Sequence, residues 1–253
     1  MTAVTGRRSV RPIVVDDWSY LPSPQPPGTR QVVCFPHAGG DVTAFAGLAA
    51  AVAPESEVWA VRLPGRGGRY AEPMPVRFDE LVSSVLTGLS PRLRPGSLFY
   101  GQSFGALLAY EVARALPAGR RPALLVPACA RAPADWAGTV PDGHAGAAEL
   151  LRLCGVSGVL PADGDIRDLT LATVRADLAV CRDYRFRPDP VCNLPVHALV
   201  GAEDPTIRAA DMAAWAAATT GPFAASVVPG GHLLATALTA GPADPLRSII
   251  QGS

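Results

Sequence analysis

SLFYGQSFGALLAYEVARAL (97–116) is the stretch of this chain that most narrowly restricts the fold. Its first part, SLFYG (97–101), is a short apolar run typical of a buried strand, and its last part, ALLAYEVARAL (106–116), has helical composition. Between them, G-Q-S-F-G (101–105) matches the pattern G-x-S-x-G. A serine on a tight turn between strand and helix projects its hydroxyl above the sheet edge, as a catalytic nucleophile must. We therefore interpret Ser103 as the nucleophile of a serine hydrolase.

The two glycines of this turn have a steric role in that interpretation. Strand and helix cross closely at such an elbow, and Gly101 and Gly105 leave out side chains that would collide there. The helix that follows Ser103 also directs N–H groups and the positive end of its dipole toward a developing oxyanion. The alternative is a serine in an ordinary glycine-rich turn without chemistry, but the flanking strand and helix favour the elbow.

Strand-like and helical segments alternate along the rest of the chain. We expect strands at 31–35, 57–63, 97–101, 122–130, 195–201 and 224–230, and helices at 43–53, 78–89, 106–116, 209–219 and 244–252. This alternation predicts a mostly parallel central sheet with helices on both faces. Together with the elbow, it predicts a single domain, 1–253, with the α/β-hydrolase fold.

Two regions interrupt this pattern. Residues 131–190 contain no convincing strand and hold helical stretches at 145–155 and 166–184, so we interpret them as a helical lid inserted over the site. Residues 1–12 carry basic and small polar side chains, and we expect them to form a loose N-terminal arm.

The general base can be found by elimination among the four histidines. His197 lies inside an apolar run and His144 inside the lid, where a solvated loop is expected, while His37 precedes the nucleophile in the chain. Only His232, after the last predicted strand, satisfies the order serine, acid, histidine that this fold uses. We therefore predict that His232 accepts the proton of Ser103.

The acid should follow a strand that lies between the nucleophile and the histidine in the chain. Asp204 comes directly after the strand predicted at 195–201, at the sheet edge that carries the catalytic loops. Its role would be to hold the imidazole of His232 in the correct tautomer. The neighbouring Glu203 is one rival, and Asp135, after the preceding strand, is a second. We predict that Asp204 is the acid.

Acyl transfer also needs two N–H donors for the oxyanion. One should be the backbone N–H of Phe104, the residue after the nucleophile. The other should come from the loop PHAGG (36–40), where small residues let the backbone approach a substrate carbonyl, and we favour Ala38. A turn without a catalytic role is the alternative for this loop. These groups define acyl transfer, but they do not separate esters, thioesters, amides and lactones.

Bulk composition excludes several other classes of protein. The formal net charge is zero, which argues against a nucleic-acid partner. The five cysteines show no C-x-x-C pair and no metal-ligand spacing with the histidines, so we expect free thiols and no metal or cofactor. No signal peptide and no apolar stretch long enough to cross a bilayer is present. We therefore expect a cytoplasmic protein with no membrane partner.

Five motifs in this order resemble the type II thioesterases of polyketide and nonribosomal peptide assembly lines. They are FPHAGG (35–40), LPGRGGR (63–69), GQSFGALLAYEVAR (101–114), VGAEDPTI (200–207) and VVPGGHLL (227–234). FPHAGG and PGRG are more specific than the elbow, because most α/β-hydrolases lack both. The resemblance extends from about residue 30 to the end of the chain.

This resemblance implies a stand-alone editing thioesterase without a cofactor. Such enzymes hydrolyse wrong or stalled acyl groups from the phosphopantetheine arm of acyl carrier or peptidyl carrier domains, their partners. It also implies that Ser103, Asp204 and His232 form the triad and that Ala38 and Phe104 form the oxyanion hole. The alternatives are a serine esterase or a product-releasing, cyclising acyl transferase on the same fold, and a non-catalytic binding module that retains the fold.

Two stretches depart from the family pattern. Gln102 stands where the family usually has histidine beside the nucleophile, and we expect it to tune the elbow without entering the triad. The segment 126–136 differs from the family's usual polar, arginine-containing stretch, which bears on lid anchoring and on the acyl pocket. Phe104, Leu107 and Trp136 could line that pocket or pack in the core.

Three arginines cluster in the predicted loop at 62–69. We expect Arg62, Arg66 and Arg69 to be solvated surface side chains with structural hydrogen bonds. The alternative is contact with a pantetheine phosphate or with an acidic carrier surface.

Overall fold

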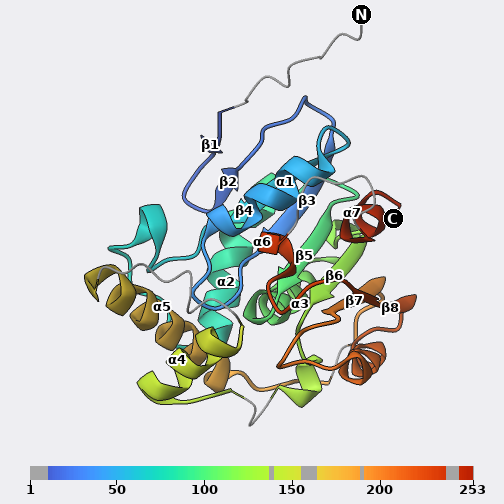
Figure 1. Ribbon diagram of the computed structural model, residues 1–253. Coiled ribbons are helices and arrows are strands. Elements are labelled where there is room, and N and C mark those ends of the chain that lie inside the picture. The colour runs from blue at the N-terminus through green and yellow to red at the C-terminus, as the bar shows by residue number, and fades with distance from the viewer. Residues whose placement is uncertain (1–10, 137–139, 155–163, 189–190, 238–244, 253) are drawn as a thin grey trace, which may run out of the picture.

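The strands of the described residues form one eight-stranded sheet at the centre of the molecule (Figure 1). The computed structural model describes residues 11–136, 140–154, 164–188, 191–237 and 245–252. The strands are β1 (Ile13–Val14), β2 (Ser19–Leu21), β3 (Arg30–Phe35), β4 (Ser56–Val61), β5 (Leu98–Gln102), β6 (Leu124–Ala128), β7 (Val196–Gly201) and β8 (Phe223–Val228). Their order is β1-β2-β4-β3-β5-β6-β7-β8, and only the β1–β2 and β2–β4 pairs are antiparallel.

Helices cover both faces of this sheet. The α-helices are α1 (Ala46–Val52), α2 (Phe78–Leu89), α3 (Phe104–Ala115), α4 (Gly143–Leu153), α5 (Gly164–Asp183), α6 (Leu234–Ala237) and α7 (Pro245–Gln251). In the strands, alternate residues enter two separate cores, as the pleat requires: Val33 and Phe35 face α2 and α3, while Val32 and Cys34 face α1, α6 and α7 (Figure 1). The predicted α/β-hydrolase architecture is therefore confirmed.

The clearest differences from the sequence prediction are the first two strands and the helix expected at 209–219; the short helix α6 was not expected either. β1 and β2 were not expected, because strands of two and three residues are too short to show an alternating pattern. The helix expected at 209–219 is a 3₁₀ helix, Ala209–Ala218, anchored by Trp215, whose Nε1 donates to Ala130 O at 2.9 Å. The alanine-rich composition of this segment predicts a helix, but it does not distinguish a 3₁₀ helix from an α-helix.

The described part of residues 131–190 holds α4, α5 and a 3₁₀ turn, Pro133–Asp135, and no strand. The two helices pack against each other, and α5 also contacts α2 (Figure 1). Residues 137–139, 155–163 and 189–190 of the proposed lid, and residues 1–10 of the expected arm, lie outside the described residues. None of the helices described is both long and apolar enough to span a bilayer.

Candidate active site

Ser103 occupies the strained elbow that the sequence predicts. It lies between β5 and α3 with φ 54° and ψ −121°, a backbone conformation that side chains rarely adopt. A Cβ on Gly101 would collide with the backbone of Gly105, and one on Gly105 would collide with the carbonyl of Phe35. The glycines are thus required by close backbone approach, and Ser103 N donates to Ala128 O at 2.9 Å to hold the turn.

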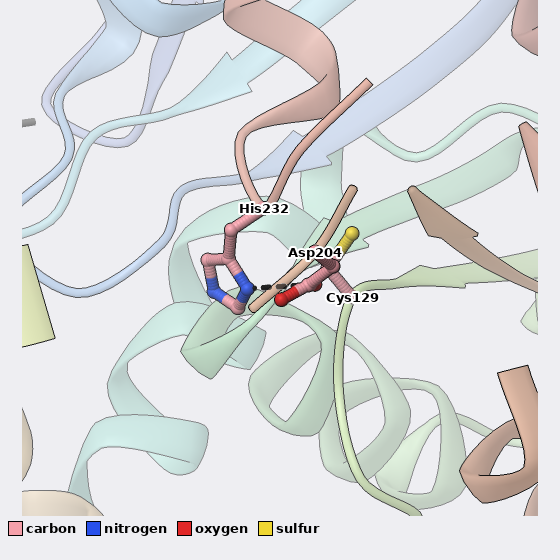
Figure 2. A group of neighbouring side chains, drawn as sticks. All are labelled: Cys129, Asp204 and His232. Carbon is pink, nitrogen blue, oxygen red and sulfur yellow. Dashed lines mark hydrogen bonds and ion pairs between the residues drawn. The ribbon is translucent and has the colours of Figure 1, made fainter. Parts of the chain in front are cut away.

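Asp204 and His232 meet at the carboxyl ends of β7 and β8. His232 Nδ1 lies 2.9 Å from Asp204 Oδ2, and the two side chains are 5 % and 0 % exposed, respectively (Figure 2). Parallel strands end at one edge of the sheet, so loops distant in sequence converge there. The hydrogen bond fixes the imidazole, with Nδ1–H directed to the carboxylate, which leaves Nε2 as the basic atom.

Thr206 completes the surroundings of the carboxylate. Its backbone N and its hydroxyl both donate to Asp204 Oδ1 at 2.8 Å, and Ile207 N donates to the same oxygen at 3.1 Å. Although burial opposes the charged form, these bonds and the one from His232 hold the pKa of Asp204 below its usual value. Sequence reasoning missed Thr206, although a threonine two residues after an aspartate is a known turn signal.

Protonation of His232 should control the pH dependence of the reaction. Burial favours the neutral ring, but the hydrogen bonds with Asp204 and with the nearby Cys154 thiol outweigh it and raise the pKa of His232 to about 9. Because a general base must be neutral, kcat/KM should rise from pH 7 through about pH 9. The raised pKa also stabilises the fold below pH 6.5, an effect that is lost as the pH approaches 9. A pH–rate profile corrected for spontaneous hydrolysis tests this, and a plateau already reached at pH 7 would contradict it.

The other histidines and acids occupy different environments. His197 Nε2 lies 2.8 Å from Ser226 Oγ on the next strand, so it is a sheet-face residue as expected. His144 lies in the first turn of α4 and not in a loop. His37 is half-buried, and burial together with the charges of His232 and Arg66 lowers its pKa to about 4, so it is neutral at pH 7.

The rival acids do not replace Asp204 beside the histidine. Asp135 is exposed, in the 3₁₀ turn after β6. Glu203 has its own partner: its Oε2 accepts from Gly230 N at 2.6 Å in the loop before His232. Among the described residues, Asp204 is the carboxylate that bonds to the imidazole.

Ala38 and Phe104 both border the cavity that contains Ser103. Ala38 follows β3, and Phe104 is the first residue of α3, where a backbone N–H has no partner within its own helix. Neither N–H donates to an acceptor in the described part of the chain. This placement leaves both donors available for an oxyanion, which is the role that the sequence predicts.

The cavity has a volume of about 380 Å³ and is mostly apolar. Ser103 and His232 lie on its wall, and helix α4 contributes Leu150 and Leu153. Phe104 and Trp136 also line it; Leu107 is fully buried in the core and is not part of its wall. An apolar chain with its carbonyl at Ser103 is therefore the ligand that this cavity suits best.

Ser103 Oγ has no hydrogen bond among the described residues, including to His232. The bond between nucleophile and base is often long before substrate binds and tightens in the complex. If Ser103 is the nucleophile, its hydrogen bond to His232 has to form when substrate binds.

Cys129 adds a thiol next to the Asp204–His232 pair (Figure 2). Its Sγ and the donor atoms of the pair lie within 4.8 Å of one another, and its backbone has a positive φ of 49°. Burial raises the pKa of this thiol, which disfavours the thiolate that a metal requires. The carboxylate and the imidazole are already bonded to each other, so these donors suit proton transfer better than metal binding.

Gln102 connects the elbow to the loop that carries His232. The side chain is buried, its Nε2 donates to His232 O at 2.6 Å, and its Oε1 accepts from Ala235 N at 3.2 Å and from Tyr100 Oη at 3.0 Å. This residue therefore does more than tune the elbow, because it fixes the backbone at His232 and again three residues later at Ala235. The sequence indicated its position but not these partners.

Replacing Gln102 with leucine should lower kcat about 10-fold or more, since a misplacement near 1 Å can cost about 100-fold. The fold should also lose about 1–3 kcal/mol for each backbone group left unpaired. Gln31 is a matched control, because it is also buried and bridges Arg94 N and Arg92 O far from the site. Thermal melts and steady-state rates should show that Gln31→Leu loses stability alone. Equal effects of both variants on kcat would refute a positioning role for Gln102.

The arginine cluster is not solvated as expected. Arg66 and Arg69 are buried; Arg66 pairs with Asp177 of α5, and Arg69 pairs with Glu72 and donates to Arg62 O. Their hydrogen-bonding capacity is used inside the protein. The prediction of solvated side chains was wrong for Arg66 and Arg69, because a loop motif does not reveal a buried partner 111 positions along the chain. The expected structural hydrogen bonds are present, and Arg62 is half-buried.

Comparison with known proteins places this architecture in one family. The family model described as "Thioesterase domain" matches residues 30–244. Thioesterase PikA5 of Streptomyces venezuelae is 35% identical over 230 residues, which cover 88% of this chain and 82% of its own length.

Solved structures agree with that assignment. The RedJ thioesterase of the prodiginine pathway of Streptomyces coelicolor is 34% identical, with a TM-score of 0.78 over 91% of this chain and 88% of RedJ. The type II thioesterase BorB of the borrelidin cluster is 33% identical, with a TM-score of 0.72 over 87% of this chain and 90% of BorB. This chain therefore belongs to the thioesterase family and is a hydrolase of the α/β-hydrolase fold that acts on thioesters.

Proposed function

We propose that this enzyme hydrolyses acyl thioesters held on the phosphopantetheine arm of acyl carrier or peptidyl carrier proteins in a polyketide or nonribosomal peptide assembly line. The observation that carries the proposal is one apolar cavity whose wall holds Ser103, His232 and Ala38. The relatives support it, since RedJ comes from the prodiginine pathway and BorB from the borrelidin cluster. The five free cysteines fit a reducing, cytoplasmic setting.

In the proposed acylation step, Ser103 Oγ attacks the thioester carbonyl while His232 Nε2 accepts its proton. Asp204 stabilises the resulting imidazolium through the Nδ1–H bond. The N–H groups of Ala38 and Phe104 hold the tetrahedral oxyanion. Collapse of this intermediate breaks the C–S bond, and His232 returns the proton to the departing pantetheine sulfur.

Deacylation repeats these roles with water. His232 takes a proton from water, and the hydroxide attacks the ester carbon of acylated Ser103. The oxyanion forms in the same hole, and collapse releases the carboxylic acid and restores the serine hydroxyl. No cofactor takes part in either step. Helices α4 and α5 act as the lid, which keeps the acyl chain out of water.

The proposal is tested by comparing acyl-pantetheine or acyl-carrier thioesters with oxygen esters of the same acyl group. We expect a higher kcat/KM for the thioesters and a further gain when the carrier protein is attached. A strong preference for oxygen esters would refute the thioester assignment and favour the esterase. Product analysis by mass spectrometry separates hydrolysis from cyclisation, since only hydrolysis adds water to the acyl group.

A non-catalytic role is tested separately with a fluorophosphonate probe. Labelling of the native protein, and its loss in Ser103→Ala, would show an activated serine. Absence of labelling in the native protein would favour a binding module that retains the fold.

A further inference from the structure

A buried ion pair joins the lid helix α5 to the loop that follows β4. Arg66 Nη2 lies 2.5 Å from Asp177 Oδ1 and Arg66 Nη1 lies 2.8 Å from Oδ2, while the side chains are 5 % and 0 % exposed. Such bidentate geometry is the strongest form of this contact. Removing two charges from water costs free energy, and further hydrogen bonds to the pair are needed to offset that cost. The other hydrogen-bond partners of Arg66 and Asp177 are therefore important.

Those remaining partners are the backbone groups next to the predicted oxyanion donor. Asp177 Oδ2 accepts from Gly39 N at 2.7 Å, and Arg66 Nη1 donates to Gly40 O at 3.1 Å. The ion pair thus holds the loop after Ala38 by one donor and one acceptor. The N–H of Gly39 and the carbonyl of Ala38 belong to one peptide plane. Fixing this N–H therefore restricts rotation about the Cα–C bond of Ala38.

Helix α5 also lies directly against this loop. Gly39 has a φ of 75°, and a Cβ built on it would collide with Val174, one helical turn before Asp177. The carboxylate is therefore within reach of Gly39 N because the helix packs on the backbone itself. The packing of α5 on Gly39 therefore determines both the position of the Asp177 side chain and the conformation of the loop.

We propose that Asp177 is a positioning residue for the oxyanion hole, because it holds the Gly39 N–H and so orients the Ala38 N–H toward the carbonyl bound at Ser103. Arg66 has a second part in this arrangement: it neutralises a carboxylate that would otherwise oppose negative charge developing nearby. The inference rests on the proposed role of Ala38. It also makes α5 the fixed part of the lid, since moving this helix would disturb the donor.

Two double variants separate the hydrogen bond from the charges. Arg66→Met with Asp177→Asn removes both charges but keeps an amide oxygen for Gly39 N–H. Arg66→Met with Asp177→Leu removes the charges and the acceptor together. Replacing a buried ion pair by neutral side chains of similar volume usually preserves folding, which thermal melts verify for both variants.

We expect kcat to be at least about 10-fold lower with leucine than with asparagine at position 177, because loss of a whole oxyanion donor costs about 100-fold to 1,000-fold. KM should change little. The midpoint of the pH–rate profile, which reports the pKa of His232, should not shift. Binding of an alkyl boronic acid, whose adduct with Ser103 carries an oxyanion, should weaken in parallel with kcat.

Asp183 supplies the matched control on the same helix. It accepts from Phe78 N at 2.9 Å and so ties α5 to α2 without touching the oxyanion loop. Asp183→Leu should lose stability but keep kcat and boronate affinity.

Equal kcat for the two double variants, a change in KM alone, or an unchanged boronate affinity would overturn the positioning role of Asp177. If the native enzyme hydrolysed no thioester and bound no boronate, the proposed function itself would fail, and the inference with it.

Discussion

Replacing Ser103 with alanine should abolish thioester hydrolysis and leave the fold intact. Loss of a serine nucleophile in comparable enzymes reduces kcat by about 10⁴-fold to 10⁶-fold. The hydroxyl has no hydrogen bond among the described residues, so its removal leaves no partner unpaired. The strained backbone is held by Ser103 N and its neighbouring glycines, which the substitution does not change. Single-turnover assays with an acyl-pantetheine thioester measure the effect, and a melting curve checks the fold.

The chain offers a close control for this experiment. Ser226 also lies next to a histidine, with its Oγ 2.8 Å from His197 Nε2, but the pair sits on strands β7 and β8 outside the cavity wall. Ser226→Ala should keep full turnover and full labelling by a fluorophosphonate. Substantial turnover in Ser103→Ala, or loss of turnover in Ser226→Ala, would show that the nucleophile has been misassigned.

The sequence was most informative where function constrains the backbone. The elbow needs glycine on both sides of Ser103 because strand and helix backbones approach closely, and that requirement is visible in the residue types themselves. The order serine, acid, histidine along the chain then left His232 as the base. It left three candidates for the acid, which are Asp204, Glu203 and Asp135. The structure reduces these three to Asp204, because it alone bonds to the imidazole among the described residues.

Sequence reasoning was least informative about buried polar partners. Arg66 resembled a surface residue, yet its guanidinium is enclosed with Asp177, which is distant in sequence. One signal was present: Asp177 falls on the same face of α5 as Val174, Leu178 and Cys181, a spacing that predicts burial. A carboxylate on an apolar face needs a partner, but only the fold shows which one.

Gln102 illustrates the same limit at shorter range. Its place beside the nucleophile is evident from the sequence, whereas its bond to His232 O depends on how the last loop crosses the sheet. The site is thus supported by bonds between segments on opposite sides of the nucleophile in the chain. The loop of Ala38 is tied to α5, and the loop of His232 is tied to β5.

Asp204→Asn should reduce kcat nearly as severely as loss of the serine, by about 10⁴-fold. The reason is the fixed orientation of the new amide. Three donors, from Thr206 and Ile207, converge on Oδ1, so the asparagine oxygen must take that position and the NH₂ group must face His232. The amide then donates to Nδ1, which places the ring proton on Nε2. In that tautomer the ring cannot accept the proton of Ser103.

A fixed, wrong tautomer and simple loss of a charge should affect the alanine variant differently. Asp204→Ala removes the carboxylate and leaves Nδ1 of the ring 2.9 Å from Thr206 Oγ1. A hydroxyl can donate or accept, so either tautomer is allowed and this variant should be no more damaging than Asp204→Asn. Raising the pH should not rescue the asparagine variant, because its ring is already neutral and only wrongly protonated.

Glu203→Gln and Asp135→Asn are the controls for the two rival acids. Glu203→Gln keeps an oxygen for Gly230 N, and Asp135 is exposed, so both variants should stay within a few-fold of the native rate. If Asp135→Asn or Glu203→Gln lost turnover instead, the acid would have to be reassigned. If Asp204→Ala were clearly slower than Asp204→Asn, the tautomer explanation would be wrong, because both variants lack the charge and the amide would then support the ring instead of misdirecting it.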